Sequence, residues 1–164
     1  MNHRSKSKDY ILNPDKPIRF FLNFEPEPPR VTHQEKKFGG VTKKGTPIYY
    51  PTPELANARA LLKAKLAPFA PHTPWKCPIQ LTTEWSYRRS EKEEKKPPHK
   101  RAMWMTTKPD TDNLQKMLKD VMTEVGFWID DAYVCLEVNS KIYHDYDEKH
   151  GILISVINLN NLSS

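Results

Sequence analysis

The sequence has no long apolar run and few cysteines, and each absence excludes a class of protein. No stretch approaches the roughly 20 apolar residues that span a bilayer, and the opening MNHRSKSKDY lacks the apolar core of a signal peptide. Cys77 and Cys135 stand alone without CxxC spacing, which argues against a disulfide scaffold or a zinc knuckle. We therefore expect a cytoplasmic protein with no membrane partner and with two reduced, buried thiols.

Proline is absent after residue 109, and the charge of the chain divides at the same place. Residues 1–109 contain all 15 prolines and 22 Lys/Arg against 10 Asp/Glu, whereas residues 110–164 contain 4 Lys/Arg against 10 Asp/Glu. The first part should form strands and loops, and the second part uninterrupted elements. A basic surface beside an acidic cluster is typical of phosphate binding next to a metal site. On composition alone, an unevenly charged surface without function is equally possible.

The length of 164 residues is close to the commonest domain size, and a hydrophobic content of 37% is sufficient for one core. We expect one domain over residues 17–160. A polar segment, residues 1–16, precedes it, and a short tail, residues 161–164, follows it.

Local patterns predict a mixture of strands and helices. Residues 79–88 alternate as in a half-buried strand, whereas residues 111–125 repeat apolar residues at helical spacing. Thr52 followed by Pro53 is typical of a helix start, and Gly126 of a helix end. We expect further strands over residues 18–24, 133–143 and 151–157, and a strand over 102–106 that pairs back. Residues 34–45 should form a hairpin or mobile loop, followed by a short strand over 47–50. The first helix should run from Pro53 to about Ala67, with Leu61 on its apolar face.

The segment RRSEKEEKKPPHKR, residues 88–101, is strongly basic. It has two interpretations of equal weight, a flexible arm that binds the nucleic-acid backbone or a solvated hairpin loop. Its basic residues are Arg88, Arg89, Lys92, Lys95, Lys96, Lys100 and Arg101.

Two pairs of aspartates flank the helix expected over residues 111–125. Asp110 and Asp112 stand at its start, where they could simply cap it and complement its dipole, with Asp112 and Lys116 forming an ion pair. Asp130 and Asp131 follow its end. Because a helix of 15 residues is about 22 Å long, only an extended return along the helix would bring the two pairs near each other.

The motif Asp110-x-Asp112-Asn113-Leu114-x-Lys116, followed by Gly126-Phe127-Trp128-x-Asp130-Asp131-Ala132-x-Val134, closely resembles the signature of the RusA family of Holliday junction resolvases. The resemblance is most specific over residues 110–141, and residues 18–158 correspond to the whole family domain. It implies an α+β fold with a single mixed-sheet domain and two main helices, assembled as a homodimer. Members are small endonucleases common in phages and prophages, which implies an enzyme of the bacterial cytoplasm.

The resemblance also implies the site. Asp110, Asp112, Lys116 and Asp131 match the catalytic residues. The three aspartates would bind Mg²⁺, for which Mn²⁺ could substitute, and Asp130 is a weaker candidate ligand. The implied substrate is a four-way DNA junction, with no nucleotide cofactor. DNA contacts are expected from the basic segment and from Arg30, Lys108, Lys119 and Lys141.

One departure from the family pattern concerns the segment after the first strand. It offers only Pro26, Pro28, Pro29 and Arg30 where the family often has a denser run of Pro and Arg. Two alternatives stay open: a nuclease of the same fold that acts on other branched or flapped DNA, and a non-catalytic nucleic-acid-binding module.

Overall fold

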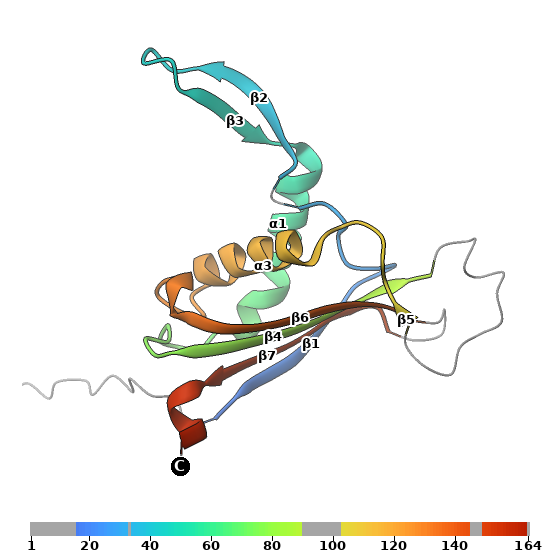
Figure 1. Cartoon of the computed structure of the whole chain (residues 1–164), viewed down its shortest axis with the longest axis vertical. Coiled ribbons are helices and arrows are strands. Elements are labelled where there is room, and N and C mark those ends of the chain that lie inside the picture. Colours follow the sequence, from blue (N-terminus) through green and yellow to red (C-terminus); the bar gives the residue numbers. More distant parts are fainter. Residues whose placement is uncertain (1–15, 33, 90–102, 145–148, 164) are drawn as a thin grey trace, which may run out of the picture.

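The structure is a computed structural model that describes residues 16–32, 34–89, 103–144 and 149–163 (Figure 1). A mixed five-stranded sheet has two helices on one face, and a separate two-stranded hairpin projects beyond them. The sheet order is β1 (Ile18–Asn23), β7 (Gly151–Asn158), β4 (Ile79–Arg88), β6 (Val134–His144) and β5 (Met103–Trp104). The helices are α1 (Pro53–Leu66) and α3 (Thr111–Val125), the hairpin is β2 (Lys36–Val41) and β3 (Pro47–Pro51), and short 3₁₀ turns span Ala67–Phe69, Asp131–Tyr133 and Leu159–Ser163. The expected α+β class with two main helices and a mixed sheet is confirmed.

Strand β4 lies at the centre of the sheet and alternates as predicted. It pairs with β7 in antiparallel and with β6 in parallel orientation. The side chains of Ile79, Leu81, Thr83, Trp85 and Tyr87 are all buried in the core, where they meet the apolar residues of the helices. No helix among the described residues has the length and apolar content needed to cross a membrane.

Both helices begin where the sequence predicts. The Thr52 hydroxyl accepts a hydrogen bond from the Leu55 amide at 3.2 Å, and Pro53 occupies the first turn of α1. Asp110 occupies the capping position of α3, but its side chain makes no capping hydrogen bond. Gly126 ends α3 in the left-handed conformation with φ 96°, which a residue without a Cβ adopts readily.

The segment after Gly126 turns back along the second half of α3 only, so it makes part of the return that the sequence left open. Phe127 and Trp128 are buried, and their backbone joins Trp75: Trp75 N donates to Phe127 O at 3.0 Å, and Ile129 N donates to Trp75 O at 3.2 Å. The Trp128 indole donates to the Thr123 hydroxyl at 2.7 Å. These contacts fix where the chain delivers Asp130 and Asp131.

Three expectations are wrong. The strand before α3 does not pair back on the strand that precedes it in sequence, β4. It pairs with β6, with Met103 opposite Tyr143, because β6 lies between it and β4. Leu61 is exposed, since α1 buries a narrower stripe than its leucines suggest. Cys77 is buried as expected, but Cys135 is exposed. Most of the basic segment, residues 90–101, lies outside the described residues.

Candidate active site

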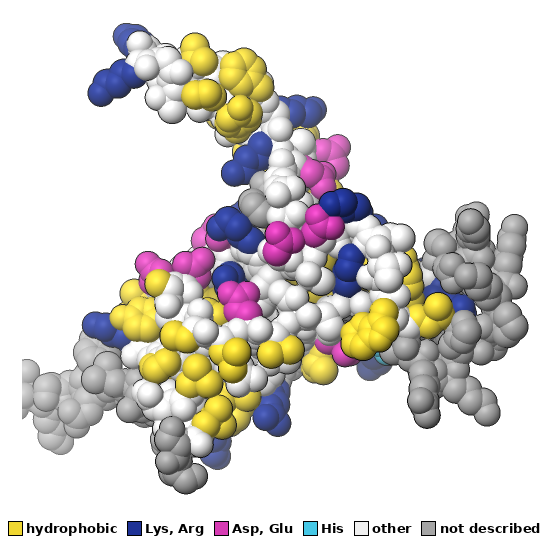
Figure 2. Space-filling view, in the orientation of Figure 1, with side chains coloured by type: hydrophobic (Ala, Val, Ile, Leu, Met, Phe, Trp, Pro, Cys, Tyr) yellow, Lys and Arg dark blue, Asp and Glu magenta, His cyan; other side chains and the backbone are white. Residues whose placement is uncertain are grey.

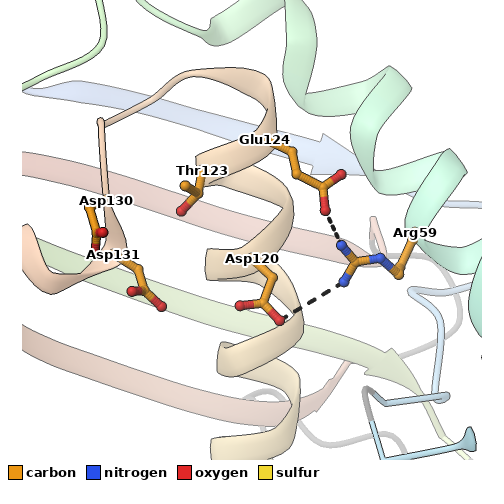
Figure 3. Close-up of a pocket in the computed structure, with 6 residues that line it drawn as sticks. All are labelled: Arg59, Asp120, Thr123, Glu124, Asp130 and Asp131. Atoms are coloured by element: carbon orange, nitrogen blue, oxygen red, sulfur yellow. Dashed lines mark hydrogen bonds and ion pairs between the residues drawn. The ribbon is translucent and has the colours of Figure 1, made fainter. Parts of the chain in front are cut away.

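The two aspartate pairs lie at opposite ends of α3. Asp110 and Asp112 occupy its start, whereas Asp130 and Asp131 line a pocket with Asp120 and Thr123 from its second half (Figure 3). Asp120, the residue of this pocket nearest to Asp112 along α3, is eight positions further on, about 12 Å along the axis. Within the described ranges, no group of three or more His, Cys, Asp or Glu is close enough to hold a metal ion. One chain therefore separates the carboxylates that the sequence resemblance groups together.

The pocket at the start of α3 surrounds Asp110 with cations. Its volume is about 320 Å³. The Asp110 carboxylate forms an ion pair with Lys108. The Lys141 ammonium reaches over from β6 and donates to Pro109 O at 2.6 Å and to Thr107 O. The lining residues are Arg30, Thr32, Gln34, Glu35, Lys108, Pro109, Asp110 and Asn113.

The electrostatics of this pocket favour an anion. Partial burial lowers the pKa of Lys141, and the nearby charges of Lys108 and Arg30 lower it further, while Asp110 raises it. Arg30 stays charged because hydrogen bonding to Glu27 raises its pKa, and its guanidinium lies 5.0 Å above the Tyr87 ring. Three cations therefore lie near the Asp110 carboxylate, although Glu27 pairs with Arg30 and Glu35 also lines the pocket. Such lysines and arginines are groups that bind phosphate.

Arg30 is held by the core. The Tyr87 ring beneath it is buried, and the Tyr87 hydroxyl donates to Pro29 O at 3.2 Å. Arg30 Nε donates to Glu27 Oε1 at 2.6 Å, and the other oxygen of Glu27 accepts from the Arg88 amide at 3.1 Å. The prolines after β1 thus deliver a fixed guanidinium to the pocket.

The pocket at the other end of α3 has a volume of about 350 Å³ and is lined by Arg59, Asp120, Thr123, Glu124, Asp130 and Asp131. Arg59 of α1 pairs with Glu124 and lies 4.0 Å from Asp120 (Figure 3). Asp130 accepts a hydrogen bond from the Ala132 amide at 2.8 Å, so it caps the following turn. Figure 3 shows the Asp131 carboxylate pointing toward Asp120.

The lysines of α3 do not make the ion pair that their spacing suggested. The Lys116 ammonium instead lies 3.5 Å from the carboxylate of Asp120, one turn further along α3. Lys119 pairs with Glu137 of β6. Lys116 is thus directed toward the Asp131 end of the helix, and the exposed Asp112 carboxylate is left facing solvent.

The residues expected to contact DNA lie in different surroundings. Arg30, Lys108 and Lys141 meet at the Asp110 pocket, whereas Lys119 is occupied by Glu137. Arg89 is only 6% exposed, with Nη2 3.7 Å from the Met103 sulfur. Lys92, Lys95, Lys96, Lys100 and Arg101 lie outside the described residues.

Sequence reasoning missed four residues at the two pockets. Asn113 is buried and lines the Asp110 pocket, and its place in the Asp-x-Asp-Asn motif was the available signal. Asp120 and Glu124 are spaced four residues apart on α3, which placed them on one face. No local sequence pattern pointed to Arg59, because its contacts depend on how α1 packs against α3.

Comparison with known proteins identifies the family of the chain. The family model described as endodeoxyribonuclease RusA matches residues 26–156, which is more than three quarters of the chain. A crossover junction endodeoxyribonuclease rusA of Lactococcus phage r1t is 29% identical over 142 residues, covering 85% of this chain and 98% of the relative. The family match includes both aspartate pairs and the segment between them, and it begins after β1. The chain therefore belongs to the RusA family of endodeoxyribonucleases, and the expectation that it is an enzyme is confirmed.

Proposed function

We propose that the protein is a divalent-metal-dependent endonuclease that resolves four-way DNA junctions by paired, symmetric cuts in recombination and repair. The observation that carries the proposal is the pair Asp110 and Asp112 at the start of α3, with three cations around Asp110. The name of the phage relative, a crossover junction endodeoxyribonuclease, supports the same substrate.

The donor chemistry fits Mg²⁺, with Mn²⁺ as a substitute. Carboxylate oxygens are the ligands that Mg²⁺ prefers, and Asp110, Asp112 and Asp131 would hold it, with Asp130 as a weaker ligand. A bound Mg²⁺ supplies an activated water and neutralises charge on the leaving oxygen. Arg30, Lys108 and Lys141 would orient the scissile phosphate, and Lys116 would stabilise the negative charge that develops on it.

We infer further that the protein works as a homodimer, because a second copy can close the gap between the aspartate pairs. One edge of β6 pairs with β4. The other edge pairs with β5 only at Tyr143 and Ile142, so over residues 134–140 it has no strand partner among the described residues. Leu136 and Val138 are exposed there. Such an edge favours pairing with another chain.

A two-fold axis near Glu137 would pair two β6 edges in antiparallel orientation. In that register the partner's strand covers the free edge over residues 134–140 and ends beside β5, whose Met103 pairs with Tyr143. The partner's Asp131 would then lie near the segment that leads from β5 to Asp110. Each site would then combine Asp110 and Asp112 of one chain with Asp131 of the other. Such a dimer has two equivalent sites, as paired cleavage of a two-fold symmetric junction requires.

Mixing two inactive variants tests this arrangement. In a dimer of one Asp112→Asn chain and one Asp131→Asn chain, a site shared between chains leaves one site with both changes and the other intact, so cleavage of one strand returns. If each site lies within one chain, each of the two sites carries one substitution, and no cleavage returns. The matched control mixes Asp112→Asn with Asp110→Asn, which must stay inactive in either case. Recovery in the first mixture alone supports the shared site, whereas a parental protein that cuts no DNA with Mg²⁺ would overturn the endonuclease proposal itself.

A further inference from the structure

The hairpin formed by β2 and β3 projects away from the sheet and beyond α1 (Figure 1). Residues 36–51 contain four lysines and no acidic residue: Lys36 and Lys37 lie at the base, and Lys43 and Lys44 at the tip. Figure 2 shows basic side chains at the far end of the hairpin and hydrophobic side chains along it. The proposed cleavage site does not include residues 36–51.

One face of the hairpin is aromatic and exposed. Phe38 pairs with Tyr49 and Val41 with Pro47, so these side chains share a face, and the rings of Phe38 and Tyr49 lie 5.9 Å apart. Phe38 is 64% exposed, Val41 60% and Tyr49 57%. A two-stranded hairpin buries little by itself, and large aromatic side chains left open on it favour a partner that covers them.

The aromatic residue on the opposite face of the hairpin is Tyr50, and its ring packs against the backbone of the neighbouring strand. A Cβ at Gly39 would lie 2.2 Å from the Tyr50 ring, so Tyr50 packs directly over the Gly39 backbone at the bulge in β2. Tyr50 is also 58% exposed, but one side of its ring lies against Gly39, whereas Phe38 and Tyr49 form the paired aromatic face.

The tip is preformed by its own hydrogen bonds. Gly45 N donates to Thr42 O at 2.9 Å, Thr46 N donates to Thr42 Oγ1 at 3.1 Å, and Thr42 N donates to Thr46 O at 2.8 Å. Gly45 has φ 79°, which this three-residue loop requires. Lys43 and Lys44 therefore sit on an ordered turn, and little ordering entropy is lost when they bind.

The base of the hairpin adjoins the candidate active site. Gln34 and Glu35, just before β2, line the same pocket as Asp110 and Lys108. The backbone of Glu35 also accepts a hydrogen bond from Thr52 N at 3.1 Å, which ties the hairpin to the start of α1. The base of the hairpin therefore lies beside the pocket that contains Asp110.

We propose that this hairpin binds unpaired bases at the branch point of the DNA, with Phe38 and Tyr49 stacking on the bases and the four lysines holding the adjoining phosphates. The inference rests on the proposed branched substrate. The lysines at base and tip are about 20 Å apart, which spans about six nucleotides of a stacked strand. Aromatic rings flanked by cations are the combination that single-stranded nucleic acid binds. A second copy of the hairpin would instead bring like charges together.

Two double variants separate stacking from simple apolar contact. Phe38→Leu with Tyr49→Leu keeps an apolar face but removes both rings, whereas Phe38→Tyr with Tyr49→Phe keeps both rings. Each is made in the Asp112→Asn background, and binding to a four-way junction and to linear duplex of the same sequence is measured without divalent metal. We expect the leucine pair to weaken junction binding by at least about fivefold, the lower end of one aromatic–base stack, and the exchange pair to bind within about twofold of its parent.

Three outcomes overturn the inference: junction binding unchanged by the leucine pair, equal losses on junction and linear duplex, or a loss explained by a change in oligomeric state in sedimentation. A second readout uses the unaltered hairpin. 5-Bromodeoxyuridine at the branch point should photocrosslink to residues 36–51, and the same base ten or more pairs along an arm should not. A protein that crosslinks there but never cuts DNA would contradict the proposed endonuclease and leave the hairpin contact standing.

Discussion

The hydrogen bond between Trp128 and Thr123 should control both stability and the placement of Asp131. Trp128 is buried, and its indole N–H donates to Thr123 Oγ1 at 2.7 Å. Thr123→Val replaces the hydroxyl with a methyl group of similar size, so the indole donor stays buried without an acceptor. Leaving such a group unsatisfied costs about 1–3 kcal/mol in the free energy of unfolding.

For a chain of this length, that loss lowers the melting temperature by roughly 2 to 12 °C. Thr123→Ser is the matched control, because it keeps the oxygen that accepts from Trp128 and donates to Lys119 O at 2.9 Å. Thermal unfolding followed by circular dichroism would compare the three proteins. Cleavage measured well below the melting temperatures should also fall more for Thr123→Val, since the hydroxyl anchors the segment leading to Asp131. Equal melting temperatures for valine and serine variants would refute this reasoning.

The remaining predictions concern the metal site, the basic segment and the helix end. Asp112→Asn should keep the fold and junction binding but lose Mg²⁺-dependent cleavage, and cleavage near the parental rate would contradict the metal assignment. Replacing Lys92, Lys95, Lys96 and Lys100 with alanine should reduce the slope of log binding constant against log salt by up to about one unit per lost phosphate contact, and an unchanged slope would show that the segment does not touch DNA. Gly126→Ala should cost about 1–2 kcal/mol through its left-handed backbone alone, because the added Cβ would lie 3.6 Å from Pro74 and meets no clash; denaturant unfolding measures this.

Local elements could be predicted from the sequence because their signals are local. The alternation in β4, the Thr52 cap and the Gly126 stop each depend on a few neighbouring residues, and each forms as expected. From the sequence, the return of the chain along α3 could be named only as a requirement for bringing the two aspartate pairs together. Its path depends on Trp75, which pairs with the return segment from about 50 residues earlier in the chain.

The candidate site was harder to predict, because motif spacing does not report distance in space. Asp112 and Asp131 are 19 residues apart in sequence, and α3 lies along much of the gap between them. The pairing of β6 beside β4, which carries Lys141 to the Asp110 pocket, is likewise a long-range contact. Arg59 could not be predicted either, because its ion-pair partners are on another helix.

Cleavage of a synthetic four-way junction in the presence of Mg²⁺ tests the central claim most directly. We expect a protein that sediments as a homodimer, cuts two strands of like polarity at symmetry-related positions and leaves linear duplex of the same sequence essentially intact. A panel with flapped and three-way substrates would show whether other branches are cut. Equal cleavage of linear duplex, or unpaired nicks from a protein that sediments as a monomer, would contradict junction resolution.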